Sequence, residues 1–270
     1  MPWLSRPDGS ETVDLHYEAD GDGRIVVFLH GLAGHCGEWA TTAAAVSSGY
    51  RSIRLDQRGH GLSTRRPADL SRAAFAADVA ALIEHSSRGG PVPVIGQSMG
   101  AHTALVLAGL YPDLVSHLIM VEGDVGGGGQ QAVDEICGVI QGWPSSFASL
   151  AEVTAFFGGD TEAGRAWAAG YFERGGRWWP RFDPNSVAEV MAPVFERERW
   201  DIWEELKMPV DLVMAARSWM DPDRIGRMRS ARPDAGYHVI PGAGHDVHLD
   251  QPERWHQLLE SLLTARMRKL

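Results

Sequence analysis

The chain has 270 residues, a formal net charge of −10 and a hydrophobic content of 44%. This length and composition favour one large globular domain, or one domain with an insertion, over two full enzyme domains. The acidic balance disfavours a phosphate backbone as a partner, so we expect no nucleic-acid binding. The apolar runs are much shorter than the roughly 18–20 residues that cross a bilayer, so we expect no membrane contact.

The N-terminus and the cysteines bear on the compartment of the protein. The first residues contain no basic segment followed by an apolar one, so we expect no signal peptide. Only Cys36 and Cys137 occur, which are too few for a disulfide framework and fit a reducing cytoplasm. The basic residues are almost all arginine, with only Lys207 and Lys269 as lysines, which indicates a GC-rich bacterial source.

Short apolar runs that predict strands alternate with helical patterns along most of the chain. Several runs are almost continuously apolar, as is typical of strands that are buried on both faces of a sheet. Hydrophobic residues recur at helical spacing between them, for example in 75–83 and 255–262. This alternation predicts an α/β fold with a mostly parallel, doubly wound sheet. The predicted strands are 13–17, 25–29, 51–55, 92–95, 118–121, 210–215 and 237–240.

The alternation stops between residues 126 and 208. This stretch holds six of the ten tryptophans, and Gly and Pro interrupt its helical pattern. We predict a helical cap at 126–208, entered through the four glycines at 126–129, over a core formed by 1–125 and 209–270. The tryptophans suggest an apolar or aromatic-lined substrate cavity, with the packed core of the insertion itself as the alternative interpretation.

The strongest chemical signal is the G-x-S-x-G pentapeptide at 96–100. It follows a predicted strand and opens a predicted helix, which is the context in which this motif marks a nucleophile elbow. A sharp turn there lifts the Ser98 hydroxyl above the strand ends, and only small neighbours let the chain pass so closely. An ordinary glycine-rich turn is the plain alternative, so the interpretation depends on segments elsewhere in the chain.

Two such segments follow other predicted strands. His30-Gly31-Leu32 comes directly after one strand, and we predict that the backbone N–H groups of Leu32 and Met99 bind an oxyanion. His245 follows the last strand, where a general base would lie. His245 and His248 have no identifiable third ligand, so we expect no metal. Acyl transfer by a serine and a histidine needs no organic cofactor, so we expect none.

These segments, together with D-x-R-G-H-G-x-S at 56–63, resemble the α/β-hydrolase superfamily, specifically its capped serine-hydrolase branch of esterases and lactonases. The segments follow one another along the chain in the same order as in that family, and the resemblance covers nearly the whole chain. The resemblance implies an α/β-hydrolase fold and a triad in the order serine, acid, histidine, with Ser98 as nucleophile and His245 as base. It also implies that 56–63 is a structural turn, so we assign no catalysis to it.

Three residues are candidates for the acid of this triad. Most members place it just after the strand that corresponds to 210–215, where this chain has Ser218 and where Asp221 is the nearest acid. A minority, such as one group of haloalkane dehalogenases, place it after the preceding strand, where this chain has Glu122. We favour Glu122, keep Asp221 as the alternative and rank Asp124 third.

The predicted function is hydrolysis of a small-molecule carboxylic ester, lactone or thioester through an acyl-enzyme. Two other classes stay open. One is a lyase or a cofactor-free oxidative or perhydrolytic enzyme that uses the same triad, and the other is a ligand-binding protein without turnover. The only partner that we expect is a small-molecule substrate, and the sequence carries no signal for an oligomeric state.

Overall fold

The computed structural model describes residues 2–87 and 89–267. Its centre is an eight-stranded sheet with the order β1-β2-β4-β3-β5-β6-β9-β10. β1 and β2 pair antiparallel, as do β2 and β4, and all the pairs from β4 onward are parallel. The predicted sheet is therefore confirmed. The strands are β1 (Trp3–Asp8), β2 (Glu11–Asp20), β3 (Arg24–Leu29), β4 (Tyr50–Leu55), β5 (Val92–Gln97), β6 (Val115–Val121), β9 (Val210–Ala215) and β10 (Gly236–Ile240).

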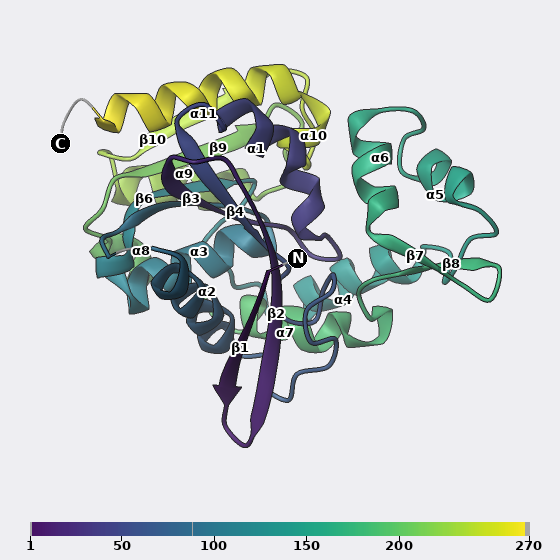
Figure 1. The fold of residues 1–270 in the computed structure, drawn as a ribbon. Coiled ribbons are helices and arrows are strands. Elements are labelled where there is room, and N and C mark those ends of the chain that lie inside the picture. The colour runs from purple at the N-terminus through teal and green to yellow at the C-terminus, as the bar shows by residue number, and fades with distance from the viewer. Residues whose placement is uncertain (1, 88, 268–270) are drawn as a thin grey trace.

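Helices cover both faces of this sheet (Figure 1). Side chains alternate along a strand, so Val26 and Phe28 of β3 join one apolar cluster, and Val27 and Leu29 join the other. The first cluster includes residues of α11, and the second includes residues of α2, α3 and α9. The core elements are η1 (Cys36–Trp39), α1 (Ala40–Val46), α2 (Arg72–Ser86), α3 (Met99–Leu110), η2 (Pro112–Leu114), α9 (Pro222–Ala231), α10 (Val247–Asp250) and α11 (Pro252–Met267).

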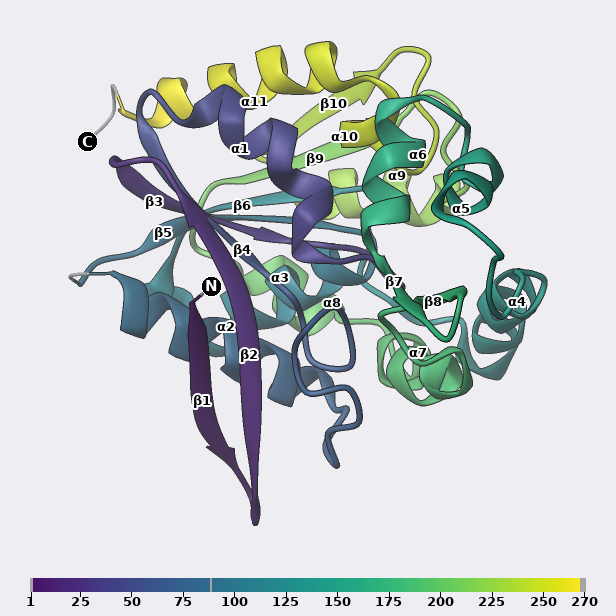
Figure 2. The ribbon, with the colours of Figure 1, turned by 45° about the vertical axis from the view of Figure 1, so that its right-hand side comes forward.

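The segment proposed as the cap stands between β6 and β9. Figure 2 shows α4, α5, α6 and the hairpin β7-β8 on one side of the sheet. The hairpin is an addition to the predicted helices, and its strands pair antiparallel. α8 packs against α3, and its Trp203 belongs to the apolar cluster that contains residues of α2, α3 and α9. The elements are α4 (Gly129–Gln141), α5 (Leu150–Phe156), α6 (Glu162–Ala169), β7 (Tyr171–Arg174), β8 (Arg177–Pro180), η3 (Pro184–Ser186), α7 (Val187–Phe195) and α8 (Trp200–Glu205).

None of the helices in 2–87 and 89–267 combines the length and the apolar character that a membrane span requires.

A buried ion-pair network around Arg58 fixes the turn that follows β4. Arg58 is fully buried, and its guanidinium donates to both carboxylate oxygens of Asp78, at 2.6 and 2.7 Å. It also donates to Asp8 at 2.8 Å and to the carbonyl of Asp69 at 2.6 Å. One side chain thus joins this turn to β1 and α2.

We expect Arg58→Met to lower the free energy of unfolding by about 3 kcal/mol, because among the described residues Asp78 then stays buried with only Arg6 as its cationic partner. Urea denaturation followed by circular dichroism measures the change. Arg197→Met is the matched control, since Arg197 and its partner Asp201 are both exposed, and an exposed pair contributes roughly 0–1 kcal/mol. Equal losses in the two variants would contradict a structural role for the buried network.

Candidate active site

Ser98 occupies the single position between the end of β5 and the start of α3. Its φ of 53° and ψ of −117° are unfavourable for a residue with a Cβ, so the surrounding chain must hold the turn in place. Glycines allow the tight passage: a Cβ at Gly96 would lie 2.2 Å from the carbonyl oxygen of Gly100, and one at Gly100 would lie 2.3 Å from that of Leu29. The geometry is that of a nucleophile elbow.

Glu122 directly follows β6 and is fully buried. Its Oε1 accepts the backbone N–H of Ala215 at 2.7 Å, and its Oε2 accepts the hydroxyl of Ser218 at 3.0 Å. The same Oε2 lies 3.3 Å from Nδ1 of His245. In the tautomer that donates from Nδ1 to this carboxylate, Nε2 has a lone pair that can accept a proton.

The ends of β5, β6 and β10 bring the three residues together. The backbone N–H of Ser98 donates to the carbonyl of Val121, the neighbour of Glu122, at 2.9 Å. The side-chain amide of Gln97 donates to the carbonyl of His245 at 3.1 Å. Ser98 Oγ makes no hydrogen bond within the described part of the chain, and such contacts are often long before a substrate binds. Gln97 was only a variable position of the motif in the sequence, so its linking role was missed.

The other candidate acids serve different local structures. Asp221 is exposed and caps α9 by accepting the N–H of Asp223 at 3.0 Å. Asp124 accepts the N–H of Gly126 at 2.8 Å and pairs with Arg224 at 3.0 Å. Within residues 2–87 and 89–267, neither carboxylate makes a hydrogen bond or an ion pair with His245. Glu122 is therefore the carboxylate that lies against this histidine.

The loop that follows β3 lies against the elbow. A Cβ at Gly31 would be 2.2 Å from Oε1 of Gln97 and 3.5 Å from Cβ of Ser98. Among the described residues, the N–H groups of Leu32 and Met99 have no protein acceptor. Met99 also begins α3, so its N–H lies at the positive end of that helix. Both donors are available to a group that binds beside Ser98.

Glu38 lies buried behind this loop, where its Oε1 accepts the N–H of Gly31 at 3.4 Å. Burial raises the pKa of Glu38 to about 8, and the charge of nearby Asp246 adds to the effect. A neutral carboxyl at this position puts no negative charge behind the loop that follows β3. His248, the rival of His245 in the sequence, stacks on Trp39 with ring centroids 3.9 Å apart and lies 3.6 Å from Glu38.

Ser218 stands where most α/β-hydrolases carry the acid, and here its hydroxyl supports Glu122. We expect Ser218→Ala to lower kcat about tenfold, because the carboxylate loses one of the hydrogen bonds that orient it toward His245. Steady-state kinetics on a hydrolysed ester would measure the loss. Ser230→Ala removes a serine hydroxyl from the exposed face of α9 and should leave kcat unchanged. An unchanged kcat in Ser218→Ala would remove this residue from the site.

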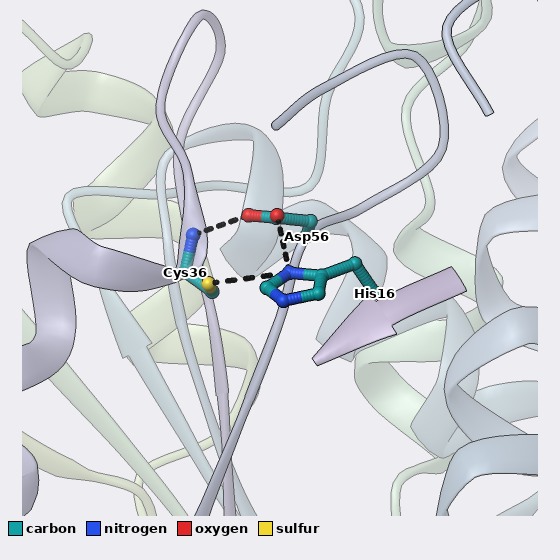
Figure 3. A group of neighbouring side chains, drawn as sticks. All are labelled: His16, Cys36 and Asp56. Atoms are coloured by element: carbon teal, nitrogen blue, oxygen red, sulfur yellow. Dashed lines mark hydrogen bonds and ion pairs between the residues drawn. The ribbon is translucent and has the colours of Figure 1, made fainter. Parts of the chain in front are cut away.

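A second polar cluster joins His16, Cys36 and Asp56 (Figure 3). Nδ1 of His16 lies 2.8 Å from Asp56 Oδ2 and 3.9 Å from Cys36 Sγ, a set that could offer a metal one atom from each residue. Asp56, however, also accepts the N–H groups of Cys36 and Leu62. Burial and the charge of Asp56 raise the pKa of the Cys36 thiol, which disfavours the thiolate that a metal needs. We interpret the cluster as the support of the turn at 56–63.

The sequence matches the family model of the alpha/beta hydrolase fold over residues 24–252, and the chain belongs to this family. It is 25% identical over 258 residues to the 2-(acetamidomethylene)succinate hydrolase of Mesorhizobium japonicum, covering 93% of this chain and 92% of that protein. It is 29% identical over 283 residues to the sn-1-specific diacylglycerol lipase ABHD11 of Mus musculus, covering 96% and 90%.

The solved structures agree on the fold. The crystal structure of E-2-(acetamidomethylene)succinate hydrolase superposes with a TM-score of 0.84 at 23% identity, covering 97% of this chain and 100% of that chain. A thermophilic esterase from Thermogutta terrifontis superposes with a TM-score of 0.78 at 20% identity, covering 98% and 99%. The predicted superfamily and fold class are thus confirmed.

Proposed function

We propose that the protein is a serine hydrolase that cleaves a small-molecule carboxylic ester, lactone or thioester. The observation that carries the proposal is the contact between His245 and the buried Glu122 beside the strained turn of Ser98. A base held by a carboxylate, together with a serine in a sharp strand-to-helix turn at the same end of the sheet, is the arrangement that acyl transfer needs. The similarity to a succinate-derivative hydrolase and a diacylglycerol lipase supports a hydrolytic reaction.

In the proposed mechanism, Ser98 attacks the carbonyl carbon while Nε2 of His245 takes the hydroxyl proton. Glu122 holds the imidazole in the tautomer with Nδ1 protonated, and it stabilises the imidazolium that forms. The imidazolium then protonates the leaving group, which leaves an acyl-enzyme on Ser98. Water, activated by the same histidine, hydrolyses this ester and restores the serine.

The negative charge of the tetrahedral intermediate is assigned to the N–H groups of Leu32 and Met99. Each donor that is preset in a site without water can contribute about 3–4 kcal/mol to transition-state stabilisation. The segment 126–208 is proposed as the cap that shapes the substrate site. Its residues Val190 and Val194 share one apolar cluster with Leu32 and Met99, so side chains of the proposed cap pack against the residues whose N–H groups are the proposed oxyanion donors.

Two measurements on the purified protein test this function. A fluorophosphonate probe should label Ser98, as located by peptide mass spectrometry. A panel of short esters, lactones and thioesters should contain at least one compound that is hydrolysed. Absence of labelling would favour a binding protein without turnover. Labelling without hydrolysis of any compound would move the assignment to lyase or oxidative chemistry on the same triad.

A further inference from the structure

Two arginines and a histidine are buried together beside Met99, at the junction of α2, α3 and the segment before α8. Arg72, His102 and Arg199 are 2%, 2% and 7% exposed. Backbone contacts place the three groups together: Arg72 donates to the carbonyl of Met99, the N–H of His102 donates to that of Ser98 at 3.1 Å, and the N–H of Arg199 donates to that of Val125 at 2.8 Å. Burial and the charges of Arg72 and Arg199 lower the pKa of His102. We call the two arginines and the uncharged ring of His102 the buried cationic cluster, after the charges of the arginines.

Arg72 is the best-placed member for binding an anion. Its Nη2 donates to the carbonyl of Met99 at 3.2 Å and to the hydroxyl of Thr103, and its guanidinium carbon lies 4.2 Å from the ring centroid of Phe75. Its Nε and Nη1 are buried and have no hydrogen-bond partner among residues 2–87 and 89–267. Within the described ranges it forms no ion pair with a carboxylate. Three of its five N–H donors are therefore unused.

His102 and Arg199 complete the cluster. His102 lies in the first turn of α3, four residues after Ser98, and both of its ring nitrogens are buried without a hydrogen-bond partner in the described part of the chain. A Cβ at Gly126 would lie 2.9 Å from Nε2 of His102, so the chain passes closely above this ring. Arg199 donates to the carbonyl of Pro193 at 3.2 Å and, within the described part of the chain, also has no carboxylate within ion-pair distance.

The acids nearest to Arg199 do not neutralise the cluster. Glu196 and Asp201 are exposed, and Asp201 pairs with Arg197. Burying a cation costs free energy unless an opposite charge or enough acceptors replace the lost water. The chain supplies Arg72 with a carbonyl and a hydroxyl, and it supplies the ring of His102 with neither. An anion from outside the chain would satisfy these groups.

We propose that the buried cationic cluster binds a carboxylate of the substrate, so that the scissile ester belongs to a molecule that carries a negative charge. This inference rests on the proposed function. It is supported by Met99, whose carbonyl accepts from Arg72 and whose N–H is the proposed oxyanion donor. It is also supported by Phe75, which lies under Arg72 and shares an apolar cluster with Leu32 and Met99. The anchor and the proposed reaction centre are thus neighbours.

Binding can be tested without turnover in Ser98→Ala by calorimetric titration with glutarate and with the neutral 1,5-pentanediol. Glutarate should bind and the diol should not. Adding Arg72→Met should weaken glutarate binding at least about tenfold, the size expected for hydrogen bonds to a charged group. Arg72→Lys should retain part of the affinity, and the control Arg165→Met, on an exposed cap residue, should retain all of it. Equal glutarate affinity with and without Arg72→Met would overturn the proposal.

A second measurement needs no change at Arg72. The unmodified protein should hydrolyse monoethyl glutarate with a kcat/KM at least about tenfold above that for ethyl pentanoate, which has a methyl in place of the carboxylate. Equal values, or a preference for the neutral ester, would overturn the anchor while leaving the hydrolase assignment intact. Failure of both esters together with absence of Ser98 labelling would instead reject the proposed function, and glutarate titration would still decide the anchor.

Discussion

Replacement of Ser98 by alanine is expected to lower kcat for ester hydrolysis by about 10⁴- to 10⁶-fold, because the proposed mechanism forms the acyl-enzyme on the Ser98 hydroxyl. The fold should be unaffected. Ser98 Oγ makes no hydrogen bond within the described part of the chain, and alanine has the same Cβ as serine in the strained turn. The residual rate would come from the N–H groups of Leu32 and Met99 and from substrate binding.

Steady-state kinetics on the best ester of the panel, with the melting temperature as a check on folding, measures this loss. Ser116→Ala is the matched control, since Ser116 lies on β6 near its amino end, far along the strand from Glu122. It should keep the activity of the unmodified protein. If a folded Ser98→Ala variant retained more than about 1% of kcat, Ser98 could not be the nucleophile, because losing a nucleophile costs orders of magnitude more.

The elbow could be predicted from the sequence because its requirements are local. A strand, a sharp turn and a helix follow one another within a few residues, and the two flanking glycines mark where the backbones approach. The same holds for several strands of the parallel sheet, such as β3 and β9, whose apolar runs are almost continuous. β1 was missed because only alternate residues are partly buried and Pro7 interrupts the pattern of a buried strand.

The acid could not be decided from the sequence, because Glu122 and Asp221 follow β6 and β9, which are neighbours in the sheet. Because these strands are parallel, their carboxyl ends lie at the same edge of the sheet. The path of the chain after β9 separates them: Asp221 turns away to cap α9, whereas Glu122 is held by the N–H of Ala215. The buried cationic cluster was equally hidden, since it depends on how α2 and α3 pack.

We expect Glu122→Gln to lower kcat about 10³- to 10⁴-fold, although the change is nearly isosteric. The amide oxygen can still accept the N–H of Ala215, so the fold should persist. The amide nitrogen would then donate to Nδ1 of His245, which moves the imidazole proton to Nε2. A histidine protonated at Nε2 cannot accept the Ser98 proton, and the negative charge that stabilises the imidazolium is also lost.

Asp221→Asn is the decisive comparison, because asparagine caps a helix about as well as aspartate and the variant should fold normally. It should retain the kcat of the unmodified protein if Glu122 is the acid. A collapse of kcat in Asp221→Asn alone would transfer the role to Asp221 and would require the loop after β9 to rearrange during catalysis. A partial loss in both variants would mean that the two carboxylates share the histidine. The contact at 3.3 Å between His245 and the buried Glu122 argues for the first outcome.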